Sequence, residues 1–268
     1  MARQEHWDYL LNALNKDLKK DDKMYKELCE RFFGTDPSTV EKSVIIEKCA
    51  SMAYGDLCRN LSGLRDMPDD KKGKWHEAVV SEIVACVQDL LDNPKDFDDW
   101  HKATCKAIRD KSVEHNVSDY VKWLKKHEHE GFSHGLAQKW LNMTLKNMLI
   151  AETASWYKKL DELRKLLHVP VDNYVIAAAH NVLGIREEKN KGFGSDPKWS
   201  RWNYVRYIDF QKKVRAAFES EGARGDYSCP IDWEFDAWIS AKNNSTPSLE
   251  VFLSTFYNID GDSDNQPN

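Results

Sequence analysis

Residues 131–149 read GFSHGLAQKWLNMTLKNML, and residues 168–175, which follow a further helical stretch, read HVPVDNYV. The first segment predicts a glycine-bounded turn that opens a helix with Lys139 in its first turn. In the second segment, a proline ends one helix and Asp172 begins the next. A lysine and a carboxylate therefore both stand at helix starts, a pair that can supply an amine nucleophile and its acid partner.

Helical periodicity extends through most of the chain and predicts an all-α fold. Apolar residues recur at helical spacing, as they do between Trp75 and Leu91, and no segment alternates as a half-buried strand would. In the helix after the glycine-bounded turn, Lys139, Asn142 and Lys146 form a polar stripe beside the apolar one.

The 268 residues carry a net charge of -5, distributed unevenly. The segment 186–224 holds ten Lys and Arg against six acids, and the acids dominate from residue 226 onward. A local basic segment can bind phosphates despite a negative total charge. No window reaches the ~18 apolar residues of a membrane helix, and the N-terminus lacks a signal-peptide pattern. We therefore expect a cytoplasmic protein with no membrane partner.

Metal ligands are not predicted. The six cysteines form no C-x-x-C pair, and His101 with Cys105 is a single pair at i,i+4 spacing. The run HEHEGFSH brings His127, His129 and His134 close in sequence, but no ligand of a known spacing follows. The cysteines are interpreted as reduced core thiols, and no metal or cofactor is expected.

Each half of the lysine–aspartate pair also has a purely structural interpretation. A lysine in a first helical turn is most often a solvated charge, and an aspartate just after a proline is most often an N-cap. Both interpretations remain open at this stage.

The chain resembles the helix-hairpin-helix DNA glycosylases, most closely the archaeal 8-oxoguanine DNA glycosylase branch. The similar features are Gln138-Lys139 after a glycine turn, and Pro170-Val171-Asp172 opening a later helix. The sequence departs from the family pattern at the hairpin, because Gly131 and Gly135 are four residues apart. The resemblance implies a two-lobed helical domain over residues 1–257 with the active site in the cleft between lobes. An acidic, disordered tail is expected at 258–268.

The resemblance also implies a DNA N-glycosylase, without a cofactor, that acts as a monomer on double-stranded DNA. The target base is flipped out of the helix, Lys139 attacks the sugar, and Asp172 steadies the positive charge. The resulting Schiff base permits abasic-site lyase activity. His134, Gln138, Asn142 and Lys146 are the candidate substrate contacts.

The excised base is either 8-oxoguanine, in DNA repair, or a hypermodified base of phage DNA, in phage defence. If the site is real, the Lys139 amine and the Asp172 carboxylate should face one cleft, flanked by the basic segment 186–213. The alternative is a non-catalytic helical module on the same scaffold that binds nucleic acid or protein.

Overall fold

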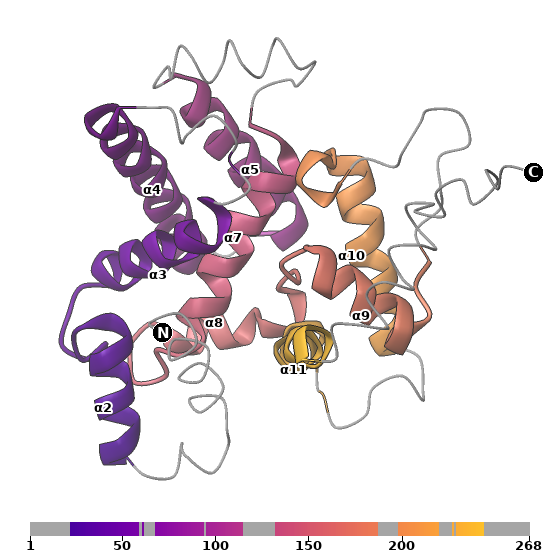
Figure 1. The fold of residues 1–268 in the computed structure, drawn as a ribbon. Coiled ribbons are helices and arrows are strands. Elements are labelled where there is room, and N and C mark those ends of the chain that lie inside the picture. The colour runs from indigo at the N-terminus through magenta and orange to yellow at the C-terminus, as the bar shows by residue number, and fades with distance from the viewer. Residues whose placement is uncertain are drawn as a thin grey trace, which may run out of the picture. The chain divides into compact units, whose positions relative to one another are not determined.

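The computed structural model describes residues 22–58, 61, 68–93, 95–114, 132–186, 198–219, 227 and 229–243. Within these residues every regular element is a helix (Figure 1), which confirms the all-α prediction. Contacts divide the chain into two compact units, residues 1–167 and 168–268. The predicted tail at 258–268 lies outside the described residues. None of the described helices has the length and apolar character needed to span a bilayer.

The first unit is organised around a ring of four packed helices. Helix α3 packs on α4 and α7, and α5 packs on the same two helices, while α2 contacts α3. The elements of this unit are α2 (Asp22–Phe33), α3 (Lys42–Leu57), α4 (Asp69–Asp92), α5 (Phe97–Glu114), α7 (His134–Met148), α8 (Tyr157–Glu162) and the 3-10 turn η3 (Arg164–Leu166).

Aromatic side chains fill the centre of that ring. Trp75 of α4 and Trp140 of α7 have ring centroids 5.6 Å apart, and Phe132 lies 6.1 Å from Trp75. Both indoles have hydrogen-bond acceptors. The Trp75 N–H donates to the Ser112 carbonyl at 3.1 Å, and the Trp140 N–H donates to the Ala50 carbonyl at 2.8 Å. The rings therefore bury large apolar areas without leaving their N–H groups unpaired.

Helix α7 is the central helix of the first unit. Every residue from His134 to Met148 is buried, on all faces of the helix. Lys139 is 6% exposed and Lys146 is 1% exposed. The interpretation of Lys139 as a solvated charge is therefore wrong. The sequence shows one apolar and one polar stripe on this helix, but it does not show that other helices cover the polar stripe as well.

The second unit packs three helices together. Helix α11 packs on α9, and α10 contacts both. The described elements are α9 (Asn173–Leu183), the 3-10 turn η4 (Trp199–Arg201), α10 (Tyr204–Glu219) and α11 (Pro230–Asn243). Gly184 ends α9 with φ of 67°, a left-handed conformation that glycine adopts without strain.

The segment before α9 is fixed to α10 by paired hydrogen bonds. The Gln211 side chain accepts from the Val169 N–H at 3.1 Å and donates to the Val169 carbonyl at 2.8 Å. One residue earlier, His168 Nδ1 lies 2.7 Å from the Tyr207 hydroxyl. These contacts set the direction in which the chain enters α9, and so the position of Asp172.

Candidate functional site

Lys139 lies in the second turn of α7, one turn later than predicted. The helix begins at His134, and the Ser133 hydroxyl caps it by accepting from the Leu136 N–H at 3.0 Å. A serine cap of this kind satisfies one of the open N–H groups of the first turn. The lysine is therefore well inside the helix, where lysine is rarely buried unless its charge has a partner.

The expected glycine hairpin differs from the prediction. Gly135 is the second residue of α7 and takes helical geometry, whereas the described glycines with positive φ are Gly34 and Gly184. Gly131 lies outside the described residues. Because Ser133 starts the helix, Gly135 contributes no hairpin turn.

Asp172 is the N-cap of α9, as the structural interpretation predicted. One carboxylate oxygen accepts from the Val175 N–H at 2.9 Å. The other accepts from the indole N–H of Trp238, on α11, at 3.1 Å. The side chain is half-buried, and the Trp238 ring also packs edge-on against Tyr174 at 5.4 Å. Two directional donors thus hold the carboxylate in one orientation.

Lys139 belongs to the first unit and Asp172 to the second. The expected meeting of the two side chains at one cleft stays a prediction, as does the position of the basic segment 186–213, of which 187–197 lies outside the described residues. The described part of that segment includes Arg206, whose guanidinium lies 4.8 Å from the centre of the Trp202 ring.

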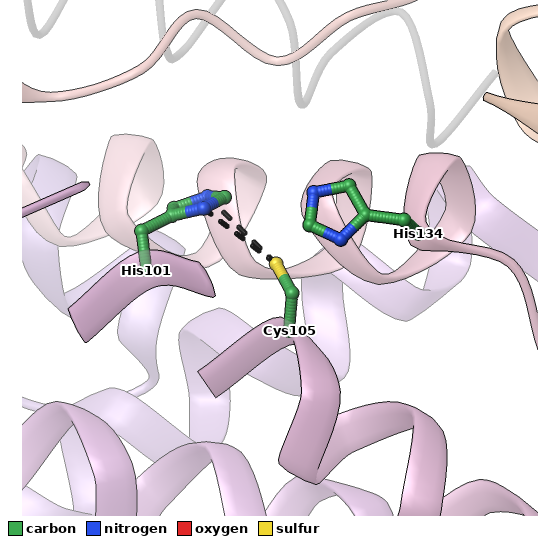
Figure 2. Close-up of side chains that lie close together, drawn as sticks. All are labelled: His101, Cys105 and His134. Atoms are coloured by element: carbon green, nitrogen blue, oxygen red, sulfur yellow. Dashed lines mark hydrogen bonds between the residues drawn. The ribbon is translucent and has the colours of Figure 1, made fainter. Parts of the chain in front are cut away.

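Three of the four predicted substrate contacts lie around a buried histidine–cysteine cluster. We define this cluster as His101 and Cys105 of α5 with His134 of α7. Their ligand-type atoms all lie within 4.8 Å of one another, and all three side chains are buried. Figure 2 shows the imidazole of His134 turned toward the Cys105 sulfur, with the ring of His101 on the other side of that sulfur.

Two amides of α7 form a directional relay to this cluster. The Gln138 amide N–H donates to the Gly135 carbonyl at 2.8 Å, and a carbonyl can only accept. The Gln138 oxygen then accepts from the Asn142 amide N–H at 3.1 Å. The Asn142 oxygen, 2.8 Å from His101 Nε2, is left to accept from that ring nitrogen. We refer to Gln138 and Asn142 as the amide relay.

The relay determines the tautomer of His101. Because Nε2 carries the proton, Nδ1 of the neutral ring presents its lone pair. That atom lies 3.7 Å from the Cys105 sulfur, and Nε2 lies 3.9 Å from it. Burial raises the pKa of the Cys105 thiol well above its usual value. In the absence of a further ligand, Cys105 therefore contacts the His101 ring as a thiol.

The sequence indicated this cluster only in part. The i,i+4 spacing places His101 and Cys105 on one face of a helix, and that signal was visible. The third member, His134, is distant in sequence and belongs to a run that suggested His127 and His129 as its neighbours, both outside the described residues. Packing of α5 on α7 brings His134 to the other two instead.

No family model matches the chain, and no solved structure matches it. The chain is similar to a methionine–tRNA ligase of Borreliella burgdorferi (strain ZS7), at 22% identity over 267 residues that cover 88% of this chain and 35% of the ligase. The chain thus spans about a third of the length of that relative.

Proposed function

We propose that the chain is a DNA glycosylase that uses Lys139 as its nucleophile and Asp172 as its acidic partner. The observation that carries the proposal is the burial of Lys139, which is 6% exposed inside the central helix of its unit. Lysine has a high cost of burial, and a fold that keeps one in its interior usually gives it a task or a partner. The resemblance in residues 138–139 and 170–172 supplies the task.

The chemistry assigns one role to each group. A flipped nucleotide presents C1′ of its deoxyribose to the amine. The Lys139 nitrogen forms a bond to C1′, and the base leaves with the electron pair of the glycosidic bond and takes up a proton. Loss of the amine proton and opening of the sugar ring give a Schiff base, from which β-elimination can break the strand.

The role of Asp172 in this scheme is electrostatic. Its carboxylate would stabilise the positive charge that grows on the sugar while the glycosidic bond lengthens, a contribution that is large in a water-poor site. Its two hydrogen bonds, from Val175 and Trp238, preorganise the carboxylate, so that little reorientation is needed during reaction. Support for this role comes from geometry around Asp172 alone.

Borohydride trapping tests the proposal. The protein is incubated with duplex oligonucleotides that contain an abasic site, 8-oxoguanine or a glucosylated pyrimidine, and the mixture is reduced. A covalent protein–DNA adduct should form, and Lys139→Gln should abolish it while duplex binding persists. Lys106→Gln, which changes an exposed lysine of α5, should leave the adduct intact. An adduct that survives Lys139→Gln would exclude this lysine as the nucleophile.

A second candidate is a helical module that binds nucleic acid without base chemistry. The similarity to a methionine–tRNA ligase, a protein named for its action on tRNA, favours this candidate. Because only about a third of that relative is spanned, ligase activity is not proposed for this chain. Binding of tRNA in preference to duplex DNA, with no adduct on any of the oligonucleotides, would select the module over the enzyme.

A further inference from the structure

The histidine–cysteine cluster combines three features of a metal site in one buried place. It offers two imidazole nitrogens and one sulfur, the donor set that zinc-class ions prefer. The donors come from two helices that pack against each other, α5 and α7, so the packing itself positions them. His101 and Cys105 are 0% exposed and His134 is 4% exposed, which separates the donors from bulk water.

We propose that His101, Cys105 and His134 bind one divalent zinc-class ion and thereby clamp α5 to α7. This inference does not depend on the glycosylase proposal. His101 would bind through Nδ1, Cys105 through its sulfur, and His134 through a ring nitrogen. Three protein ligands leave one tetrahedral position for a small ligand such as water.

The distances suit such an ion after a small closure. With Zn–N near 2.05 Å and Zn–S near 2.3 Å, tetrahedral donors lie about 3.3–3.6 Å apart. The separation of 3.7 Å between Cys105 Sγ and His101 Nδ1 is slightly longer than that range. With one ring nitrogen taken from each histidine, the three donor atoms lie within 4.8 Å of one another, so the widest pair needs to close by on the order of 1 Å to reach tetrahedral geometry. Rotation of the His101 and His134 rings would supply that movement.

The amide relay has the arrangement of an outer coordination shell. Ligating histidines usually donate their second N–H to an oxygen, which fixes the tautomer and orients the ring. Here the Asn142 oxygen accepts from His101 Nε2 at 2.8 Å, and Gln138 orients Asn142 in turn. The relay therefore leaves Nδ1 as the unprotonated nitrogen of His101. Because the sulfur lies almost as close to Nε2 (3.9 Å) as to Nδ1 (3.7 Å), it sits beside the ring, and the His101 ring must turn before its Nδ1 lone pair faces an ion bound to Cys105.

An ordinary core contact explains the cluster less completely. A thiol-to-imidazole hydrogen bond accounts for His101 and Cys105 as a pair. The His134 imidazole, with a ligand atom within 4.8 Å of those of the other two, adds a third donor to that pair. One ion would use all three donors at once.

Binding of the ion releases a proton from the cluster. The thiolate is the metal ligand, so the Cys105 thiol releases one proton to solvent as the Zn–S bond forms. Both imidazoles bind in their neutral form and release none. Uptake of one ion should thus release one proton, and no oxidant or reductant is involved.

The test uses the full-length chain without a histidine tag. The protein is stripped with a chelator under thiol-reducing conditions, then loaded with Zn²⁺ or with Co²⁺ as a spectroscopic probe. We expect one ion per chain by elemental analysis. We also expect a thiolate-to-cobalt charge-transfer band in the near ultraviolet and the strong visible bands of tetrahedral cobalt.

Cysteine variants assign the sulfur. Cys105→Ala should lose the ion and the charge-transfer band. Cys49→Ala, which removes an equally buried free thiol of α3 outside the cluster, should keep both. The wild-type spectrum needs no variant, so the test stands even if Cys105→Ala fails to fold. Wild-type protein that takes up neither ion, or a band that persists in folded Cys105→Ala, would overturn the proposal.

Discussion

Replacing Asp172 by asparagine separates its structural role from its proposed catalytic one. Sequence alone predicts a loss of only a few tenths of a kcal/mol, because asparagine caps a helix about as well as aspartate. The structure changes that expectation, since both carboxylate oxygens accept hydrogen bonds, one from Val175 and one from Trp238. Asparagine has one oxygen, so its amide N–H₂ must face one of these two donors.

The magnitude follows from the bonds lost. Asp172→Asn forfeits one hydrogen bond, about 1 kcal/mol for a half-buried pair. Asp172→Ala forfeits the cap as well, at ~1 kcal/mol, for a combined loss of about 2 kcal/mol. Trp238→Phe is the matched control, because it removes the same indole donor and keeps the carboxylate. For a chain of this size, 1 kcal/mol lowers the melting temperature by about 2–4 °C.

Stability and excision are then measured on the same three variants. Thermal unfolding followed by circular dichroism should place Asp172→Asn and Trp238→Phe at similar melting temperatures. Single-turnover excision should fall by about 100-fold or more in Asp172→Asn and Asp172→Ala but not in Trp238→Phe, because only the two Asp172 variants remove the negative charge. If Asp172→Asn and Trp238→Phe excise bases equally well while fully folded, the carboxylate is a cap and nothing more.

Two further predictions concern the amide relay and an acidic side chain of the first unit. Asn142→Leu removes the acceptor for His101 Nε2, so zinc affinity should fall by about 10–100-fold, with one ion still bound at saturation. Competition with a chelator measures the affinity. An unchanged affinity would contradict an outer-shell role for Asn142. Hydrogen bonds from Ser38, then the Lys26 ammonium, hold the pKa of Asp36 below its usual 3.8. The stabilisation of the fold by ionised Asp36 is complete above pH 3.8 and is lost as the pH falls through the lowered pKa. Plots of unfolding free energy against pH for wild type and Asp36→Asn should therefore converge at low pH. Parallel plots would show that Asp36 does not contribute.

Local sequence patterns correctly predicted those features that depend on a single helix. Helical periodicity gave the all-α fold, and the residue pattern Pro170-Val171-Asp172 gave the N-cap that α9 has. The glycine pattern predicts a later start for α7 than the structure has, because Ser133, and not a glycine turn, begins the helix by capping it. A local pattern also cannot report what covers a polar stripe, which is why the burial of Lys139 was not foreseen.

Contacts between residues of two different helices could not be predicted from the sequence. The indole of Trp238 reaches Asp172 across 66 residues, and the pairing of α5 with α7 brings His134 to His101. Helical spacing could show only that His101 and Cys105 share a face. Which third residue completes such a set is decided by helix packing, for which a single sequence holds no direct signal.

The two proposals place their chemistry on different sides of α7. Lys139 follows His134 by five residues, which is about 7.5 Å along the helix axis and about 140° around it. An ion held by His134 would therefore fix the position and rotation of the helix without touching the lysine. On this geometry the proposed metal would be structural. Stripping it should lower the melting temperature, while protein that remains folded should still form the borohydride adduct. A folded, stripped protein that forms no adduct would instead tie the ion to the reaction.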